Sequence, residues 1–137
     1  SSIQYNNSYW YRIFATNANG ASVGSNVLRV NTTNTPPQFN LSSTISIYEN
    51  TSAVVSVGAS DVEGDTLTYS LSSQAPSSDA SNMSISSDGI LAFNSARDYE
   101  NPGDYDSNNI YDITVSVSDG TDTVSQDLGI VVLDVLE

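Results

Sequence analysis

Apolar and polar residues alternate most strictly near the C-terminal end of the chain. From residue 111 to residue 118 the odd positions are apolar and the even positions polar: Tyr111, Ile113, Val115 and Val117 against Asp112, Thr114, Ser116 and Ser118. Because successive side chains of a strand point to opposite faces, this pattern predicts a strand with one buried and one solvated face. A slip of one residue would bury the polar set, so the pattern also specifies the register.

Similar alternation recurs at short spacing from Phe39 onward, which is typical of an antiparallel sandwich. We expect seven strands, at residues 44–48, 53–60, 67–71, 83–86, 90–93, 110–118 and 124–133. Ser87-Asp88-Gly89 and Asp119-Gly120 supply turn residues for two hairpins. Ser, Thr, Asn, Asp and Gly dominate and helix formers are sparse, so the prediction is an all-β fold.

A Thr- and Asn-rich stretch ending in two prolines separates this region from the start of the chain. Residues 31–38 predict an interdomain linker, because Pro36-Pro37 holds the backbone extended and blocks a central strand. We therefore expect a fragment at residues 1–30 and a domain at residues 39–137. The fragment carries β-rich segments at residues 9–13 and 27–30 around an Asn/Gly-rich connection, and a lone hairpin of this kind is marginally stable in water.

Charge and composition exclude several functions. The chain has 3 basic and 16 acidic residues and a net charge of −13, which argues against binding to nucleic acid or to an anionic membrane. It has no Cys and no His, so disulfides, thiol chemistry and a nucleophile–base pair are not available, and we expect no enzymatic activity. The apolar run Ile130-Val131-Val132-Leu133 is too short to span a membrane, and we expect any export signal or anchor to lie outside this sequence.

The acidic residues gather just outside the predicted strands in two groups. One group comprises Glu49, Asp98, Glu100 and Asp134, and the other comprises Asp61, Glu63, Asp65 and Asp119. Two carboxylates about 4 Å apart repel by about 4 kcal/mol at an effective dielectric near 20, so a cation is expected between them. With no His or Cys, the all-oxygen donor set suits a hard cation such as calcium. The alternatives are a solvated acidic surface and, for Asp61, Asp88 and Asp119, a role in turns.

The order of these motifs resembles a cadherin repeat of the kind found in large bacterial surface and secreted proteins. The matching segments are Ile47-Tyr48-Glu49-Asn50, Ala59-Ser60-Asp61-Val62-Glu63-Gly64-Asp65, Gly89-Ile90-Leu91, Asp98-Tyr99-Glu100, residues 111–120 and Leu133-Asp134-Val135-Leu136-Glu137. Residues 1–30 resemble the last two strands of a fibronectin type III domain, on the strength of Ile3, Tyr9, Tyr11-Arg12-Ile13 and Asn17-Ala18-Asn19-Gly20. In that domain Tyr9 would be the corner tyrosine.

The cadherin resemblance implies a seven-stranded antiparallel Greek-key sandwich that binds calcium ions between successive repeats. It places the C-terminal half-site at Glu49, Asp98, Glu100, Asp134 and Glu137. It places the N-terminal half-site at Asp61, Glu63, Asp65 and Asp119, with backbone oxygens near Thr33 and Thr35. Leu136 departs from the family pattern, in which the linker carries an amide or an acid.

The implied function is that of a noncatalytic calcium-binding module that rigidifies or links domains of an extracellular or cell-surface protein, with a role in cell adhesion. Its partners would be calcium, neighbouring domains of the same chain, and another surface protein or a polysaccharide. The alternative is a carbohydrate-binding accessory module of a secreted polysaccharide-degrading enzyme. An exposed, flat aromatic surface would favour this carbohydrate-binding function over the calcium-dependent one, and Trp10 is a candidate member of such a surface.

A polar segment at residues 101–109 follows the Asp98-Tyr99-Glu100 motif. Asp104, Asp106 and Asn108 stand at alternate positions, as at the start of a calcium loop, but the central Gly and terminal Glu of an EF-hand are missing. The other interpretation is a polar excursion beside the site proper.

Overall fold

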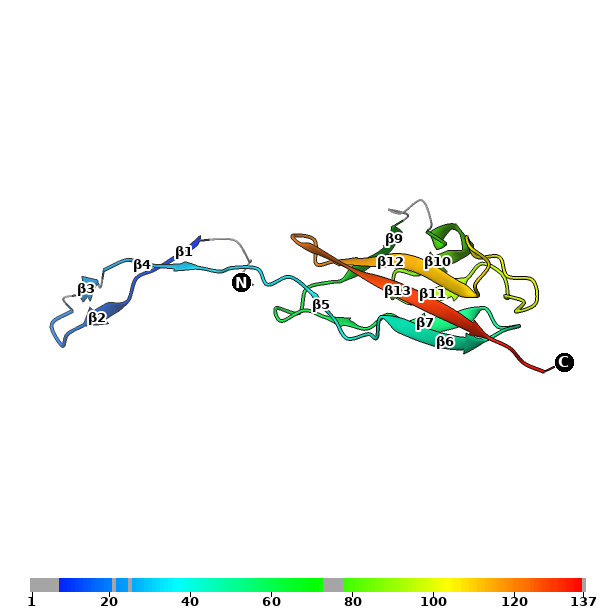
Figure 1. Ribbon diagram of the computed structural model, residues 1–137. Helices are drawn as coiled ribbons and strands as arrows, with labels where there is room; N and C mark the ends of the chain where they lie inside the picture. The colour runs from blue at the N-terminus through cyan, green and yellow to red at the C-terminus, as the bar shows by residue number, and fades with distance from the viewer. Residues whose placement is uncertain (1–7, 21, 25, 73–77, 137) are drawn as a thin grey trace. The chain divides into compact units, whose positions relative to one another are not determined.

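A computed structural model of the chain describes residues 8–20, 22–24, 26–72 and 78–136 (Figure 1). The chain divides into two compact units, Ser1–Asn34 and Thr35–Glu137. Glu137 and Ile3, both named above, lie outside the described residues. No helix within the described ranges has the length and apolar character needed to cross a bilayer.

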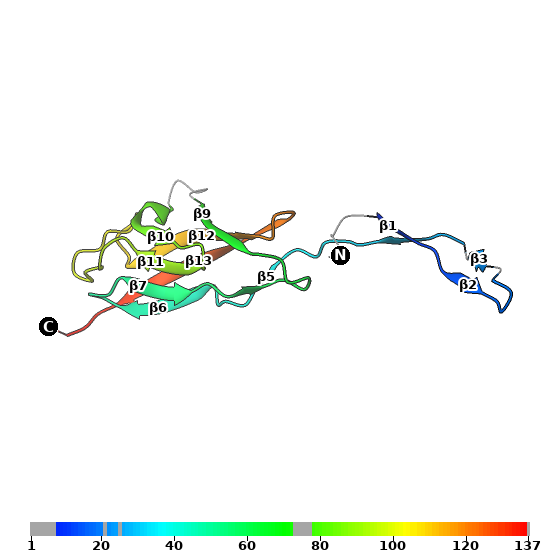
Figure 2. The ribbon, with the colours of Figure 1, turned by 180° about the vertical axis from the view of Figure 1, so that it is seen from behind.

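In the second unit, two main sheets face each other (Figures 1 and 2). The larger sheet has the strand order β6-β13-β12-β9, with β6 at Thr44–Tyr48, β13 at Thr123–Leu133, β12 at Ile110–Ser118 and β9 at Thr68–Ser72. The smaller sheet has the order β10-β11-β7, with β10 at Met83–Ile85, β11 at Ile90–Phe93 and β7 at Ala53–Ser56. A short pair, β5 at Gln38–Phe39 and β8 at Ala59–Ser60, extends the unit, and the 3-10 helix η1 spans Ala80–Asn82. This arrangement confirms the predicted all-β sandwich.

The core lies between the two sheets and uses the predicted inward faces. In β12 the side chains of Tyr111, Ile113, Val115 and Val117 are at most 3% exposed, as the alternation predicts. The rest of the buried cluster is Val57, Met83, Leu91, Phe93, Leu128, Ile130 and Val132. Tyr111 and Phe93 meet edge to face across the two sheets, with ring centroids 4.8 Å apart, so aromatic packing joins the two sheets.

Two turns match the sequence prediction. Gly89 closes the β10–β11 hairpin at φ +79°, and its N–H donates to the Ser86 carbonyl at 3.0 Å. Gly120 lies in the β12–β13 turn at φ +95°. Glycine enters this left-handed region at little cost because it has no Cβ.

The strand pattern differs from the prediction in two respects. The expected strand at 53–60 is two strands, β7 and β8, because the chain changes partners between them. Val57 N–H donates to the Gly89 carbonyl, whereas the Gly58 carbonyl accepts the N–H of Asn40 at 2.8 Å. In addition, β6 and β13 pair in parallel, with Gly129 opposite Thr44, so the larger sheet is not wholly antiparallel. Both strands therefore end at the same edge of the sandwich.

The described residues of the first unit form two strand pairs. Strand β1 (Ser8–Tyr11) pairs with β4 (Leu28–Asn31), and β2 (Phe14–Thr16) pairs with β3 (Ser22–Gly24). Trp10, in β1, is 66% exposed.

Candidate metal centres at two ends of the sandwich

The C-terminal end of the sandwich is organised by one buried carboxylate, Glu49, which directly follows β6. Its side chain is 3% exposed. Its Oε2 accepts the Tyr99 N–H and its Oε1 accepts the Val135 N–H, both at 2.8 Å. These two N–H donors keep the pKa of Glu49 below its usual value against the opposing effect of burial. Glu49 thus ties three segments together in its ionised form.

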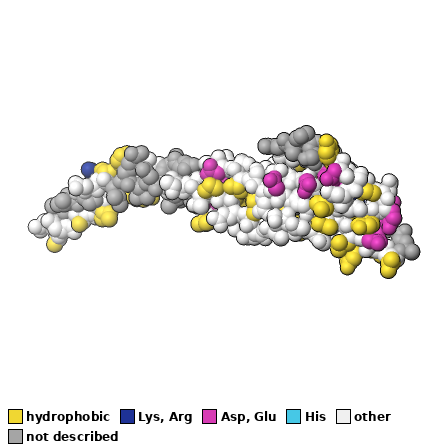
Figure 3. Space-filling view, in the orientation of Figure 1, with side chains coloured by type: hydrophobic (Ala, Val, Ile, Leu, Met, Phe, Trp, Pro, Cys, Tyr) yellow, Lys and Arg dark blue, Asp and Glu magenta, His cyan; other side chains and the backbone are white. Residues whose placement is uncertain are grey.

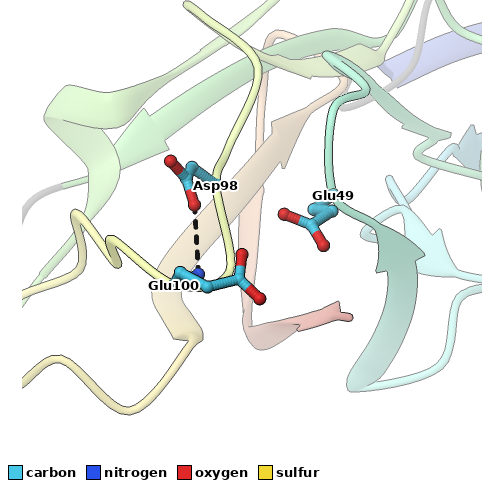
Figure 4. A group of neighbouring side chains, drawn as sticks. All are labelled: Glu49, Asp98 and Glu100. Carbon is cyan, nitrogen blue, oxygen red and sulfur yellow. Dashed lines mark hydrogen bonds between the residues drawn. The ribbon is translucent and has the colours of Figure 1, made fainter. Parts of the chain in front are cut away.

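Asp98 and Glu100 approach Glu49 from the loop that follows β11. Asp98 Oδ1 accepts the N–H groups of Glu100 at 3.0 Å and Asn101 at 3.2 Å, which is the local hydrogen bonding of an Asx turn. Figure 4 shows the Glu49 side chain directed toward this loop. One carboxylate oxygen from each of Glu49, Asp98 and Glu100 lies within 4.8 Å of the others. We call these three residues the distal cluster.

The electrostatics of the distal cluster are unfavourable without a cation. The Glu100 N–H lowers the pKa of its own carboxyl group, but burial and the charges of Glu49, Asp134 and Asp98 outweigh it and raise the pKa. Asp134, which follows β13, is therefore close enough to act on the cluster. A cation would relieve this repulsion.

The basic side chain of the second unit makes its described contacts with residues outside the distal cluster. Arg97 is its one basic residue, since Arg12 and Arg29 precede it in the first unit. The Arg97 guanidinium stacks over the Phe93 ring at 5.1 Å and donates to Asn82 Oδ1. On the face of this unit seen in Figure 3, acidic but no basic side chains are visible among the described residues.

The other acidic group lies at the opposite end of the second unit, beside the β12–β13 turn (Figures 1 and 2). Asp61 Oδ1 accepts the N–H groups of Glu63 at 3.0 Å and Asp65 at 3.1 Å. Burial, followed by the charges of Asp61, Asp119 and Glu63, raises the pKa of Asp65. The charges of the other three acids therefore act on Asp65, and we call these four residues the near cluster.

Several details of the near cluster bear on the predicted ligands. Asp61 Oδ2 is buried and accepts no hydrogen bond from any described residue, so a cation there would give it a partner. Asp119 Oδ1 accepts the N–H groups of Thr121 and Asp122, both at 2.7 Å, so Asp119 also forms the turn. The Thr35 hydroxyl donates to Glu63 Oε1 at 2.8 Å, so Thr35 lies beside this cluster. Thr33 belongs to the first unit.

A buried carboxylate that the sequence reading missed, Asp79, lies just before η1. It is 4% exposed, and its oxygens accept the N–H groups of Tyr105 at 2.8 Å and Asp112 at 2.9 Å. Burial raises its pKa, and the charges of Asp104 and Asp112 add to the rise against the two N–H donors. Its surroundings are polar in sequence, so no periodicity indicated its burial.

The 101–109 excursion uses its acidic oxygens internally. Asp104, only 7% exposed, accepts the N–H of Asn108 through Oδ2 at 2.7 Å and that of Asn109 through Oδ1 at 3.3 Å. Asp106 Oδ2 accepts the Asn108 side-chain amide at 2.9 Å. This bonding is that of a folded polar excursion.

The comparisons with known proteins agree with this architecture. Residues 34–131 match the family described as bacterial Ig domain. Among solved structures, Drosophila N-cadherin EC1-4 has a TM-score of 0.62 at 24% identity, over 97% of this chain and 34% of that one. Human protocadherin-24 EC1-2 (form II) has a TM-score of 0.59 at 26% identity, over 74% of this chain and 45% of that one.

A third similar structure comes from a bacterium. A putative alpha-galactosidase from Bacteroides fragilis has a TM-score of 0.51 at 16% identity, over 74% of this chain and 18% of that one, which shows a shared fold only. The chain spans less than half the length of each of these three structures. No curated protein sequence matches it.

The fold and the comparisons define the class of protein. It is a cadherin-like and immunoglobulin-like β-sandwich module. The chain belongs to the bacterial Ig domain family through residues 34–131, and this result confirms the predicted kind of domain.

Proposed function

We propose that this chain is a noncatalytic calcium-binding module that links or rigidifies neighbouring domains of an extracellular protein engaged in cell adhesion. The observation that carries the proposal is the approach of three carboxylate oxygens within 4.8 Å in the distal cluster. A hard divalent cation prefers such oxygen donors, and calcium accepts the irregular geometry that carboxylates from separate segments provide.

The near cluster supports the same function at the other end of the module. The buried Asp61 Oδ2 without a donor among the described residues is a position that a cation would fill. Carboxylates at both ends suit an ion that joins one module to its neighbours, because each module then supplies part of each site. The ion would act as a cross-link between the sandwich and the adjoining chain, and its removal would free the hinge.

Calcium-dependent melting tests this proposal. Calcium in the millimolar range should raise the melting temperature, and magnesium should do so weakly because it sheds water reluctantly. At about a hundredfold excess over the dissociation constant, one site adds about 2.7 kcal/mol of stability. Identical melting curves in chelator and in calcium would refute the proposal. Asp88→Asn is the matched control, since Asp88 is an exposed turn residue outside both clusters.

A carbohydrate-binding accessory module is the second candidate, and the 66% exposure of Trp10 is the observation that favours it. Adjacent strand residues point to opposite faces, so Trp10 and Tyr11 do not form one platform. Titration with soluble plant and bacterial polysaccharides, compared with Trp10→Ala, tests this candidate. Binding that is lost on the substitution would support it, and the absence of binding to any of them would reject it.

A further inference from the structure

Tyr99, which lies between Asp98 and Glu100, connects the distal cluster to the 101–109 excursion through hydrogen bonds of its backbone. The Tyr99 N–H donates to Glu49 Oε2 at 2.8 Å, on the side of the cluster. The Tyr99 carbonyl accepts the Asn109 Nδ2 at 3.0 Å, on the side of the excursion. The peptide units on both sides of Tyr99 are therefore held, and these units carry the two acidic residues.

Asn109 is built into the sandwich at this position. Its backbone is left-handed at φ +64°, a region that asparagine enters more readily than most residues. Its carbonyl accepts the Val132 N–H at 2.9 Å, which joins it to β13. Its Oδ1 is buried and accepts no hydrogen bond from a described residue. The hydrogen bond described for the side-chain amide is therefore the one that its Nδ2 donates to the Tyr99 carbonyl.

Two buried carboxylates hold the excursion that presents Asn109. Asp104 accepts the N–H groups of Asn108 and Asn109, which closes the C-terminal half of the excursion. Asp79 accepts the N–H groups of Tyr105 and Asp112, which joins the middle of the excursion to the start of β12. Buried charge-assisted hydrogen bonds of this kind resist local opening.

The position of Asn109 matters because the cluster repels itself. Without a cation, repulsion among Glu49, Asp98 and Glu100 opposes the contact of the 98–100 loop with Glu49, and any loop that opens must be ordered again when an ion binds. Ordering flexible backbone costs free energy at each residue, so a loop held in place beforehand binds more tightly.

We propose that Asn109 is a positioning residue that sets the cation affinity of the distal cluster by holding the Tyr99 carbonyl, with the 101–109 excursion as its support. This inference rests on the proposed calcium function and adds what regulates the site. In this proposal the 101–109 excursion supports Asn109 and does not itself bind a metal ion.

The test variant is Asn109→Gly, compared with Ser107→Gly as the matched control. Glycine keeps the left-handed backbone at both positions, since Ser107 is at φ +58° in the same excursion, but only the first change removes the amide on Tyr99. Calcium chloride is titrated into each protein and followed by the amide NMR shifts of Asp98 and Glu100 for the distal cluster. The shifts of Asp61 and Glu63 report the near cluster in the same sample.

Asn109→Gly should weaken distal calcium binding about fivefold, the effect of losing one net hydrogen bond, and leave near-cluster binding unchanged. Faster amide hydrogen exchange at Tyr99 and Glu100 in the calcium-free variant should accompany the loss. Ser107→Gly should change neither affinity. If Asn109→Gly does not fold, Asn109→Ser serves instead, because it removes the amide and Ser107 already adopts a similar φ in this excursion.

Equal distal affinities in the wild type and the Asn109 variant would overturn the positioning role, as would an equal loss at both clusters. A wild-type protein whose distal amides do not respond to calcium would refute the proposed function itself, and the positioning role would fall with it. The two failures are therefore told apart by the wild-type titration alone.

Discussion

The same substitution at two glutamates of the distal cluster should have opposite effects on the calcium-free protein. Glu49→Gln replaces one acceptor oxygen with an NH₂ group, so either the Tyr99 or the Val135 N–H faces a donor. The N–H of Glu100 lowers the pKa of its own carboxyl group, but burial and the charges of Glu49, Asp134 and Asp98 outweigh it and raise this pKa. Glu100→Gln removes the charge of this group and therefore relieves the repulsion. The first variant should be less stable than wild type, and the second more stable.

The magnitude follows from the hydrogen bonds. A backbone N–H bonded to a charged group contributes about 1.5–3 kcal/mol, and its loss from a buried position costs a similar amount. For a domain of about 100 residues, this predicts a melting temperature lower by roughly 10 °C for Glu49→Gln, less the repulsion that the change also relieves. Glu100→Gln should melt a few degrees above the wild type, because only the relief of repulsion remains.

Differential scanning calorimetry in chelator and in saturating calcium measures both effects. Both variants should lose the distal cluster's share of the calcium-dependent rise, since each removes a ligand charge from that cluster, and Asp88→Asn should match the wild type in both conditions. A shift of the same sign for the two calcium-free variants would refute the reasoning about Glu49 and Glu100. An unchanged calcium response in Glu100→Gln would remove Glu100 from the site.

Three further predictions concern acidity, the first unit and the core. The pKa values of Asp65, Asp79 and Glu100 are raised, so these carboxyl groups bind protons more readily in the folded state than in the unfolded state, and lowering the pH from about 7 toward 5 should raise the calcium-free melting temperature. The lowered pKa of Glu49 should reverse this trend below about pH 4.5. A melting temperature that falls steadily from pH 7 downward would contradict the prediction. A shortened protein beginning at Asn34 should unfold cooperatively and keep its distal calcium affinity, because the compact units divide there; aggregation would show that residues 1–33 are integral. Tyr111→Phe should cost about 1–3 kcal/mol in urea unfolding, because it leaves the Gly103 N–H without its acceptor at 3.0 Å, and a change below about 0.5 kcal/mol would show that water replaces the hydroxyl.

The sequence alone was enough to predict the elements whose signal is local. The alternation in residues 111–118 predicted both β12 and the set of buried side chains, because a two-residue period maps directly onto the two faces of a strand. Gly89 and Gly120 marked turns because their left-handed backbone suits glycine. The parallel pairing of β6 with β13 and the break at Val57–Gly58 could not be predicted in this way, since both depend on which distant strand supplies the partner.

The candidate sites divide in the same manner. The spacing of Asp98 and Glu100 is local, and its likeness to a known motif was enough to suggest ligands. The same likeness grouped Glu49 with them, but only the tertiary structure showed that its charge is held by the N–H groups of Tyr99 and Val135, residues 50 and 86 positions away. Asp79 and Asn109 left no signal in the sequence, because a buried polar residue is defined by its partners, and these partners come together only when the chain has folded.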